Sequence, residues 1–178
     1  MKRVIFIFLL FLFMNICLQA EAKIITGEVE YNTESVREEV FASPVNPLNI
    51  STYGEHLIDR NNAENLENLL KGNTDLKDRK IAKFSDGSYG VQYYNDVMYT
   101  WYYSQNGRLI SFTQKDSESY PTKFTKYRPD GNVANQGYRI SEQESYIYTP
   151  DGKLLAHWLG ENCYDEYNNI IMKRKIYK

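Results

Sequence analysis

Cysteine and histidine are scarce in this chain of 178 residues. Cys17 lies within residues 1–22, which we predict below to be a cleaved signal peptide, so the mature chain holds Cys163 alone and cannot form an internal disulfide. His56 and His157 lie far apart, and no group of Cys and His has the spacing of a zinc site. A glycine-rich phosphate loop and a Gly-x-Ser-x-Gly elbow are also missing. The sequence therefore predicts no cofactor and no metal.

A long hydrophobic run is missing after residue 22. The basic start Met1-Lys2-Arg3 leads into an apolar run over residues 4–14, which is shorter than the roughly 20 residues that cross a bilayer. Ala20-Glu21-Ala22 then places small residues where a signal peptidase cleaves. We predict a signal peptide over residues 1–22 and an exported product, periplasmic, at the cell envelope or secreted, with no membrane span after cleavage. The alternative is an uncleaved N-terminal anchor.

Excess positive charge is absent too, because the formal net charge is −2. A mildly acidic chain does not predict a nucleic-acid partner. The part after the signal has the length of one domain. We divide it into an N-terminal segment, residues 23–80, that packs on a sheet formed by residues 81–178. In the segment we predict strands at 23–31 and 36–41, a proline-containing loop at 42–51, and a helix from Asn61 to Gly72 with Leu66, Leu69 and Leu70 on one face.

One short motif recurs from residue 84 onward: an aromatic residue, a turn with Asp-Gly or Asn-Gly, then an aliphatic residue. The copies are Phe84-Ser-Asp-Gly87, Tyr103-Ser-Gln-Asn-Gly107-Arg-Leu109, Tyr127-Arg-Pro-Asp-Gly131-Asn-Val133 and Tyr148-Thr-Pro-Asp-Gly152-Lys-Leu154, with a degraded copy over residues 164–170. The turn glycines are 20, 24 and 21 residues apart, which suits one β-hairpin per unit. These dipeptides supply the positive φ that tight hairpin turns require. We interpret the recurring aspartates as turn residues rather than calcium ligands.

Strand-like segments lie between these turns, at residues 97–103, 109–113, 122–127, 144–148, 154–158 and 170–177. The predicted fold is mainly β: an antiparallel β-meander of repeated hairpins, with roughly eight to ten strands in an open or rolled sheet and one short helix in the N-terminal region. In an open sheet, Lys173-Arg174-Lys175 would protect an edge strand.

The phrase Tyr-x-x-(Asp/Asn)-Gly-x-(Leu/Val) resembles the tyrosine-aspartate repeats of Rhs-type shells and the MORN-like repeats of YwqK-type antitoxin-like proteins. The resemblance covers residues 84 to about 175. The additional glycines of a MORN unit are missing, and the chain is too short to close a Rhs shell. The resemblance implies a β-hairpin array used for scaffolding or interaction, and it transfers no catalytic residue.

The abundance of aromatic side chains is the feature that predicts a ligand-binding surface. Of the 16 tyrosines, 14 lie between residues 89 and 177. Since strand residues alternate faces, the stretch around Tyr94, Tyr99, Trp101 and Tyr102 carries rings on both faces of its hairpin. If one face is core, the other exposes rings that bind sugars, peptides or proteins. These four residues are the candidate ligand-binding residues. The alternative is a sheet covered on both faces.

Catalytic chemistry has one candidate arrangement. His157 precedes Cys163 by six positions and Asp165 follows, so a Cys-His-Asp set can be written down. No family signature surrounds Cys163, and His157 alternates with Leu155 and Leu159 in a predicted strand. We therefore predict no catalytic residue.

These features together predict an exported, non-enzymatic β-repeat protein that acts as an interaction or scaffold module at the bacterial envelope or outside the cell. Its partner is a protein or a glycan. One alternative is a hydrolase-like enzyme that uses His157 with Cys163 or a carboxylate. The other is a carbohydrate-binding module that uses the aromatic residues between Tyr93 and Tyr103.

Overall fold

The computed structural model describes residues 24–26, 29–49, 76 and 78–178. The chain divides into two compact units, Met1–Val36 and Arg37–Lys178. The predicted signal peptide and the helix predicted from Asn61 to Gly72 lie outside the described residues. No helix among the described residues has the length and apolar character needed to span a membrane.

Two short strands stand where one strand was predicted over residues 23–31. β1 (Ile24–Thr26) and β2 (Val29–Tyr31) pair antiparallel, with Ile24 opposite Tyr31. The prediction of a strand in this stretch is confirmed at β1 and β2, but the stretch folds back on itself.

The strand predicted over residues 36–41 is wrong, because α2 (Thr33–Phe41) occupies this stretch. Asn32 caps the helix: its Oδ1 accepts the backbone N–H groups of Glu34 and Ser35 at 3.0 and 2.9 Å. Ser35 Oγ in turn accepts the backbone N–H of Asn32 at 3.1 Å, a reciprocal cap that satisfies otherwise unpaired donors. Val36 and Val40, one turn apart, are both buried and give the helix an apolar side.

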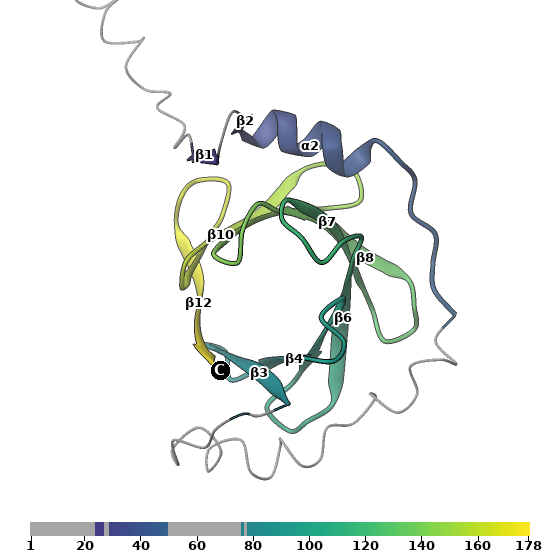
Figure 1. Cartoon of the computed structure of the whole chain (residues 1–178), viewed down its shortest axis with the longest axis vertical. Helices are drawn as coiled ribbons and strands as arrows, with labels where there is room; N and C mark the ends of the chain where they lie inside the picture. Colours follow the sequence, from purple (N-terminus) through teal and green to yellow (C-terminus); the bar gives the residue numbers. More distant parts are fainter. Residues whose placement is uncertain (1–23, 27–28, 50–75, 77) are drawn as a thin grey trace, which may run out of the picture. The chain divides into compact units, whose positions relative to one another are not determined.

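Ten antiparallel strands of the second unit close into a barrel (Figure 1). They are β3 (Arg79–Phe84), β4 (Tyr89–Tyr93), β5 (Tyr99–Tyr103), β6 (Leu109–Lys115), β7 (Thr122–Tyr127), β8 (Val133–Arg139), β9 (Glu144–Tyr148), β10 (Leu154–Leu159), β11 (Asn162–Tyr164) and β12 (Ile170–Tyr177). Each strand pairs with its neighbours in sequence, and β12 pairs back onto β3 with Ile176 opposite Ala82.

The prediction of a mainly β, antiparallel fold is confirmed, as are the six strands predicted after residue 96. The prediction of an open or rolled sheet is wrong, because the pairing of β12 with β3 leaves no free edge. Lys173, Arg174 and Lys175 therefore protect no edge strand, since β12 has β11 on its other side.

Five connections of the barrel each contain the same pattern of two backbone hydrogen bonds. In the β5–β6 connection, the N–H of Ser104 donates to the Arg108 carbonyl at 2.9 Å and the N–H of Gly107 donates to the Ser104 carbonyl at 2.8 Å. The same pair recurs in the β3–β4, β7–β8, β9–β10 and β11–β12 connections. Each is a three-residue loop whose last residue has a positive φ, 79° at Gly107 and 63° at Asn168.

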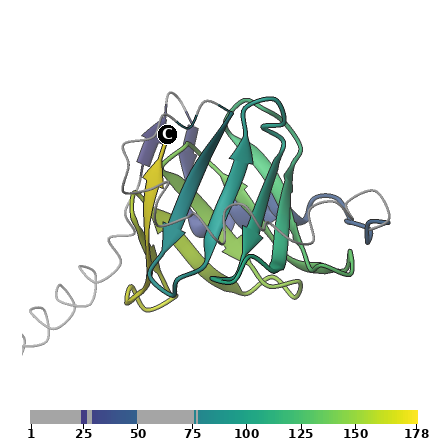
Figure 2. The ribbon, with the colours of Figure 1, turned by 90° about the horizontal axis from the view of Figure 1, so that it is seen from below.

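The aspartate before the glycine has a different role from the glycine. Asp130 Oδ1, for example, accepts the N–H of Asn132 at 3.0 Å and keeps an ordinary φ. Because the five loops are alternate connections of an antiparallel meander, they all lie at one end of the barrel (Figure 2). We call this the glycine-turn end. The connections at the opposite end, residues 94–98, 116–121, 140–143 and 160–161, share no such pattern.

The barrel wall has an aromatic outer face. Its core cluster is formed by Ile81, Tyr89, Val91, Trp101, Tyr103, Leu109, Phe112 and Tyr127, with Leu76 beside them. Val45 and Leu48, from the segment that follows α2, pack against this cluster. Gly90, Tyr102 and Ser111 are cross-strand neighbours on the opposite face of the wall. This face is the barrel interior, because Gly90 and Tyr102 line one cavity together with Arg139 of β8, a strand on the other side of the ring.

Candidate functional site

The structure does not bring the four candidate aromatic residues together on one surface. Trp101 is 1 % exposed in the outer core cluster, and the half-buried Tyr99 stacks on it with ring centroids 5.7 Å apart. Tyr102 points to the barrel interior, where the ammonium of Lys126 lies 4.8 Å from its ring centroid. Tyr94 is 46 % exposed in the β4–β5 connection. Their role in ligand binding stays a prediction.

His157 and Cys163 lie on opposite faces of the barrel wall. The register pairs His157 with Tyr164 and Trp158 with Cys163, so the two side chains have opposite parity. His157 Nε2 instead lies 3.0 Å from Glu144 Oε1, and its ring stacks on Tyr146 at 4.2 Å. The histidine and carboxylate pair of the enzyme alternative is therefore present on the outer face, without the thiol.

Cys163 is a buried thiol, 3 % exposed. Burial raises its pKa to about 11, with smaller opposing effects of Arg174 and Lys126. Because only the thiolate is a nucleophile, we expect Cys163 to resist iodoacetamide at pH 8 in the folded protein and to react fully in guanidinium chloride. Peptide mass spectrometry of the labelled protein measures this. Rapid labelling of Cys163 without denaturant would contradict the burial described here.

Acidic residues of the turns are used locally. Asp86 Oδ1 accepts the N–H and the hydroxyl of Ser88 at 2.9 and 2.6 Å, and Asp165 Oδ1 accepts the N–H groups of Tyr167 and Asn169. In the part of the chain that the structure describes, no three His, Cys, Asp or Glu side chains gather as metal ligands would.

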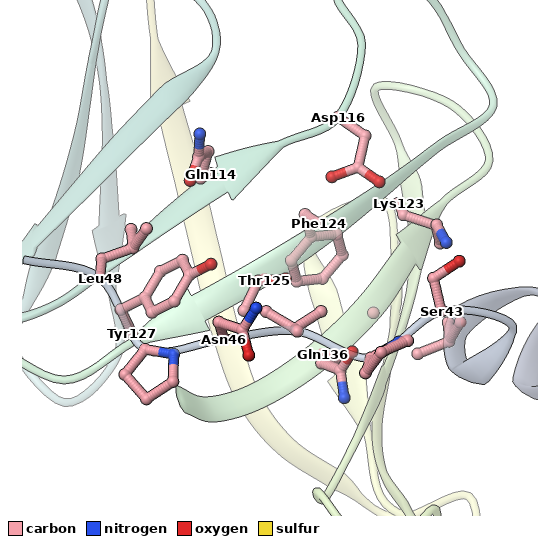
Figure 3. A pocket seen from close by; sticks show the side chains of 15 residues that line it. Ser43, Asn46, Leu48, Gln114, Asp116, Lys123, Phe124, Thr125, Tyr127 and Gln136 are labelled. Carbon is pink, nitrogen blue, oxygen red and sulfur yellow. The ribbon is translucent and has the colours of Figure 1, made fainter. Parts of the chain in front are cut away.

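A groove of about 360 Å³ runs between residues 43–48 and the outer face of β6, β7 and β8 (Figure 3). We call residues 43–48 the strap. The N–H of Leu48 anchors the strap end to the carbonyl of Gly131 at 2.9 Å. In α2, which precedes the strap, Arg37 Nε donates to the Gly152 carbonyl and Phe41 packs edge-to-face on Tyr148. The chain is therefore attached to the barrel both before the strap and at its end.

A row of neutral polar side chains forms the wall of this groove. Gln114, Thr125 and Gln136 are cross-strand neighbours on β6, β7 and β8, and all three line the groove (Figure 3). None of the three side chains hydrogen-bonds another described residue. Asp116 and Lys123 lie at the same groove and give it one charge of each sign. The groove therefore has no net charge and offers hydrogen bonds to a ligand.

The second hollow lies inside the barrel and has a volume of about 60 Å³. It is lined by residues of β3, β4, β5, β8 and β12, strands from opposite sides of the ring, which places it in the interior. Lys80, Arg139 and Arg174 line it together with Glu142. Sequence reasoning missed these cations, because the alternation along a strand does not show which face becomes the interior.

Glu142 is already engaged by two lysines. Its carboxylate lies 3.2 Å from Lys80 Nζ and 2.9 Å from Lys178 Nζ. The hydrogen bonds from Lys178 and Lys80 lower the pKa of Glu142, so the carboxylate is charged at neutral pH.

Comparison of this chain with family models, with curated proteins and with solved structures found no match.

Proposed function

We propose that the chain is an exported, non-enzymatic interaction module that holds a polar segment of a glycan or protein partner in the strap groove. Export follows from the predicted signal peptide. The observation that supports binding in the groove is the row Gln114, Thr125 and Gln136, whose side chains have no hydrogen-bond partner among the described residues. These three side chains supply amide and hydroxyl donors and acceptors, and with no partner among the described residues they are available to hydrogen-bond a ligand.

The enzyme alternative has less support. His157 and Glu144 form a hydrogen-bonded pair, and the ring of His157 otherwise contacts the rings of Tyr146 and Tyr164. A nucleophile that this histidine could activate would have to lie within hydrogen-bond reach. Among the described residues, no serine, threonine or cysteine side chain does so.

Removal of the two amides should test the groove. In the double variant Gln114→Ala/Gln136→Ala we expect the affinity for a bound glycan or peptide to fall by roughly one to two orders of magnitude, since each lost hydrogen bond is worth about 1 kcal/mol. A ligand is first identified with the wild-type protein on a glycan array and a peptide library, and its affinity is then measured by calorimetry.

The matched control is Gln143→Ala, which removes an exposed glutamine side chain in the β8–β9 connection, outside the groove. Its affinity should equal that of the wild type, and circular dichroism should show the same fold for all three proteins. Unchanged binding in the double variant, or no binding of the wild type to either library, would sink the proposal.

A further inference from the structure

The inner face of the barrel carries five cations and no carboxylate of its own. By register, the inward-facing strand residues include Lys80, Lys115, Lys126, Arg139 and Arg174. No Asp or Glu among the described strand residues has the inward parity. One carboxylate, that of Glu142 in the β8–β9 connection, lines the cavity, and Lys80 and Lys178 share it. The remaining cations lack an ion-pair partner among the described residues.

Two guanidinium groups at the cavity keep most of their donors unused. Arg174 donates through Nε to the Gly160 carbonyl at 3.0 Å, and its guanidinium lies 4.7 Å from the centroid of Trp158. Arg139 lies 5.7 Å from the centroid of Phe124 and makes no hydrogen bond with another described residue. A guanidinium carries five N–H donors, so both groups have donors left for a ligand.

Lys115 adds charge to the same region. It is 6 % exposed, and its ammonium lies 5.7 Å from the ring centroid of Tyr120. Burial lowers its pKa, and repulsion from Arg139 and Lys80 adds to this, against a weaker opposing effect of Glu118. Repulsion from Arg139 also contributes to a lowered pKa of Arg174, after burial. The interior therefore concentrates like charges that water reaches poorly, an arrangement that is unfavourable without an anion.

We propose that the barrel interior binds a small oxyanion, of the phosphate, sulfate or carboxylate type, between the guanidinium groups of Arg139 and Arg174. Guanidinium forks match the paired oxygens of such anions. The cavity of about 60 Å³ holds roughly the volume of two water molecules, so it takes a small anion or one anionic head group. This site is separate from the strap groove and does not depend on it.

The rest of the interior limits the ligand further. Phe84 packs against Trp158 and Tyr102, with ring centroids 5.8 and 6.1 Å apart. These rings fill the interior near the start of the β3–β4 turn, so the bound anion has little room for a tail in that direction. Lys80, Lys115 and Arg139 lie at the strand ends nearest the opposite end of the barrel, which is the end from which we expect an anion to enter.

Thermal unfolding and calorimetry with inorganic phosphate test the proposal on the purified full chain. Sodium chloride of matched ionic strength is the blank. We expect phosphate at about 10 mM to raise the Tm by several degrees, because a ligand that binds only the folded state stabilises it. In Arg139→Gln/Arg174→Gln the shift should vanish and the Kd should rise at least a hundredfold. Arg128→Gln, an exposed arginine in the β7–β8 connection, is the matched control and should behave as the wild type.

The single variant Arg139→Gln separates binding from folding. Without phosphate its Tm should equal or exceed that of the wild type, since the change relieves repulsion, yet its phosphate-dependent shift should be lost. No phosphate-specific shift in the wild type, or a full shift in either glutamine variant, would overturn the proposal. Gln114→Ala/Gln136→Ala should retain the phosphate response, so failure of the groove and failure of the anion site give different results.

Discussion

Replacing Gly137 with alanine should lower the Tm of the protein by roughly 6–12 °C or prevent folding. A Cβ at this position would overlap the ring of Phe124 and the backbone carbonyl oxygen of Tyr146. Phe124 lies opposite Gly137 on β7, and Ile147 lies opposite it on β9, so the clash falls within the barrel wall. Overpacking typically costs about 1–3 kcal/mol and occasionally more, and we expect the upper end here because one overlapped atom belongs to the backbone. Each kcal/mol shifts the Tm of a domain of this size by about 2–4 °C.

Gly160→Ala is the control for this prediction. Gly160 has a φ of +61°, and nothing lies within 4 Å of an added Cβ, so only backbone strain opposes the change. That strain is about 1 kcal/mol, which gives a Tm loss of only a few degrees. Equal losses in the two variants would mean that the ring of Phe124 does not fill the space beside Gly137. Differential scanning calorimetry of both variants makes the comparison.

Trp101→Ala should destabilise the protein by about 3–5 kcal/mol in urea unfolding, the range for truncating a large buried aromatic residue. Trp101 is 1 % exposed and lies between Tyr99 and Phe112, with ring centroids 5.7 and 5.1 Å away. Tyr94→Ala, which truncates a ring that is 46 % exposed, should change the free energy of unfolding by less than about 0.5 kcal/mol. Similar values for the two variants would contradict the placement of Trp101 in the core.

The same contrast decides how a carbohydrate site must be tested. A loss of glycan binding in Trp101→Ala would report the loss of folded protein rather than the loss of a contact. Tyr94→Ala leaves the core intact, so it is the informative variant for the carbohydrate alternative. Tyr102→Ala would disturb the barrel interior, because its ring faces Lys126 and packs against Phe84.

Local patterns in the sequence were sufficient for the turns and most strands. The Asp-Gly and Asn-Gly dipeptides define the chain reversals, and the β-branched and aromatic residues between them favour strands regardless of the final topology. The helix at residues 33–41 was missed because Val36, Val40 and Phe41 favour strands, whereas the deciding interaction is the reciprocal cap between Asn32 and Ser35. The Asn32 and Ser35 pair in the sequence is typical of a helix N-terminus and could have predicted this helix.

Closure of the barrel was not readable in the same way. It depends on the register of β12 against β3, which joins residues such as Lys175 and Lys83 across most of the domain. Alternation along β5 separates Trp101 from Tyr102 but does not say which of the two lies inside, because both faces carry rings. The inner cations follow only once that choice is known, which is why Arg139 and Arg174 were not among the candidate residues.

The five matching loops at the glycine-turn end show that the barrel consists of five hairpin units, and the number of units sets the diameter of the interior. Each unit supplies two strands, so strand number changes only in steps of two if every unit stays whole. Because the diameter of a barrel grows with its strand number, a chain with one unit fewer would close at eight strands around a narrower interior. Duplication or loss of a single unit would therefore change which ligand fits inside while leaving every remaining turn unaltered.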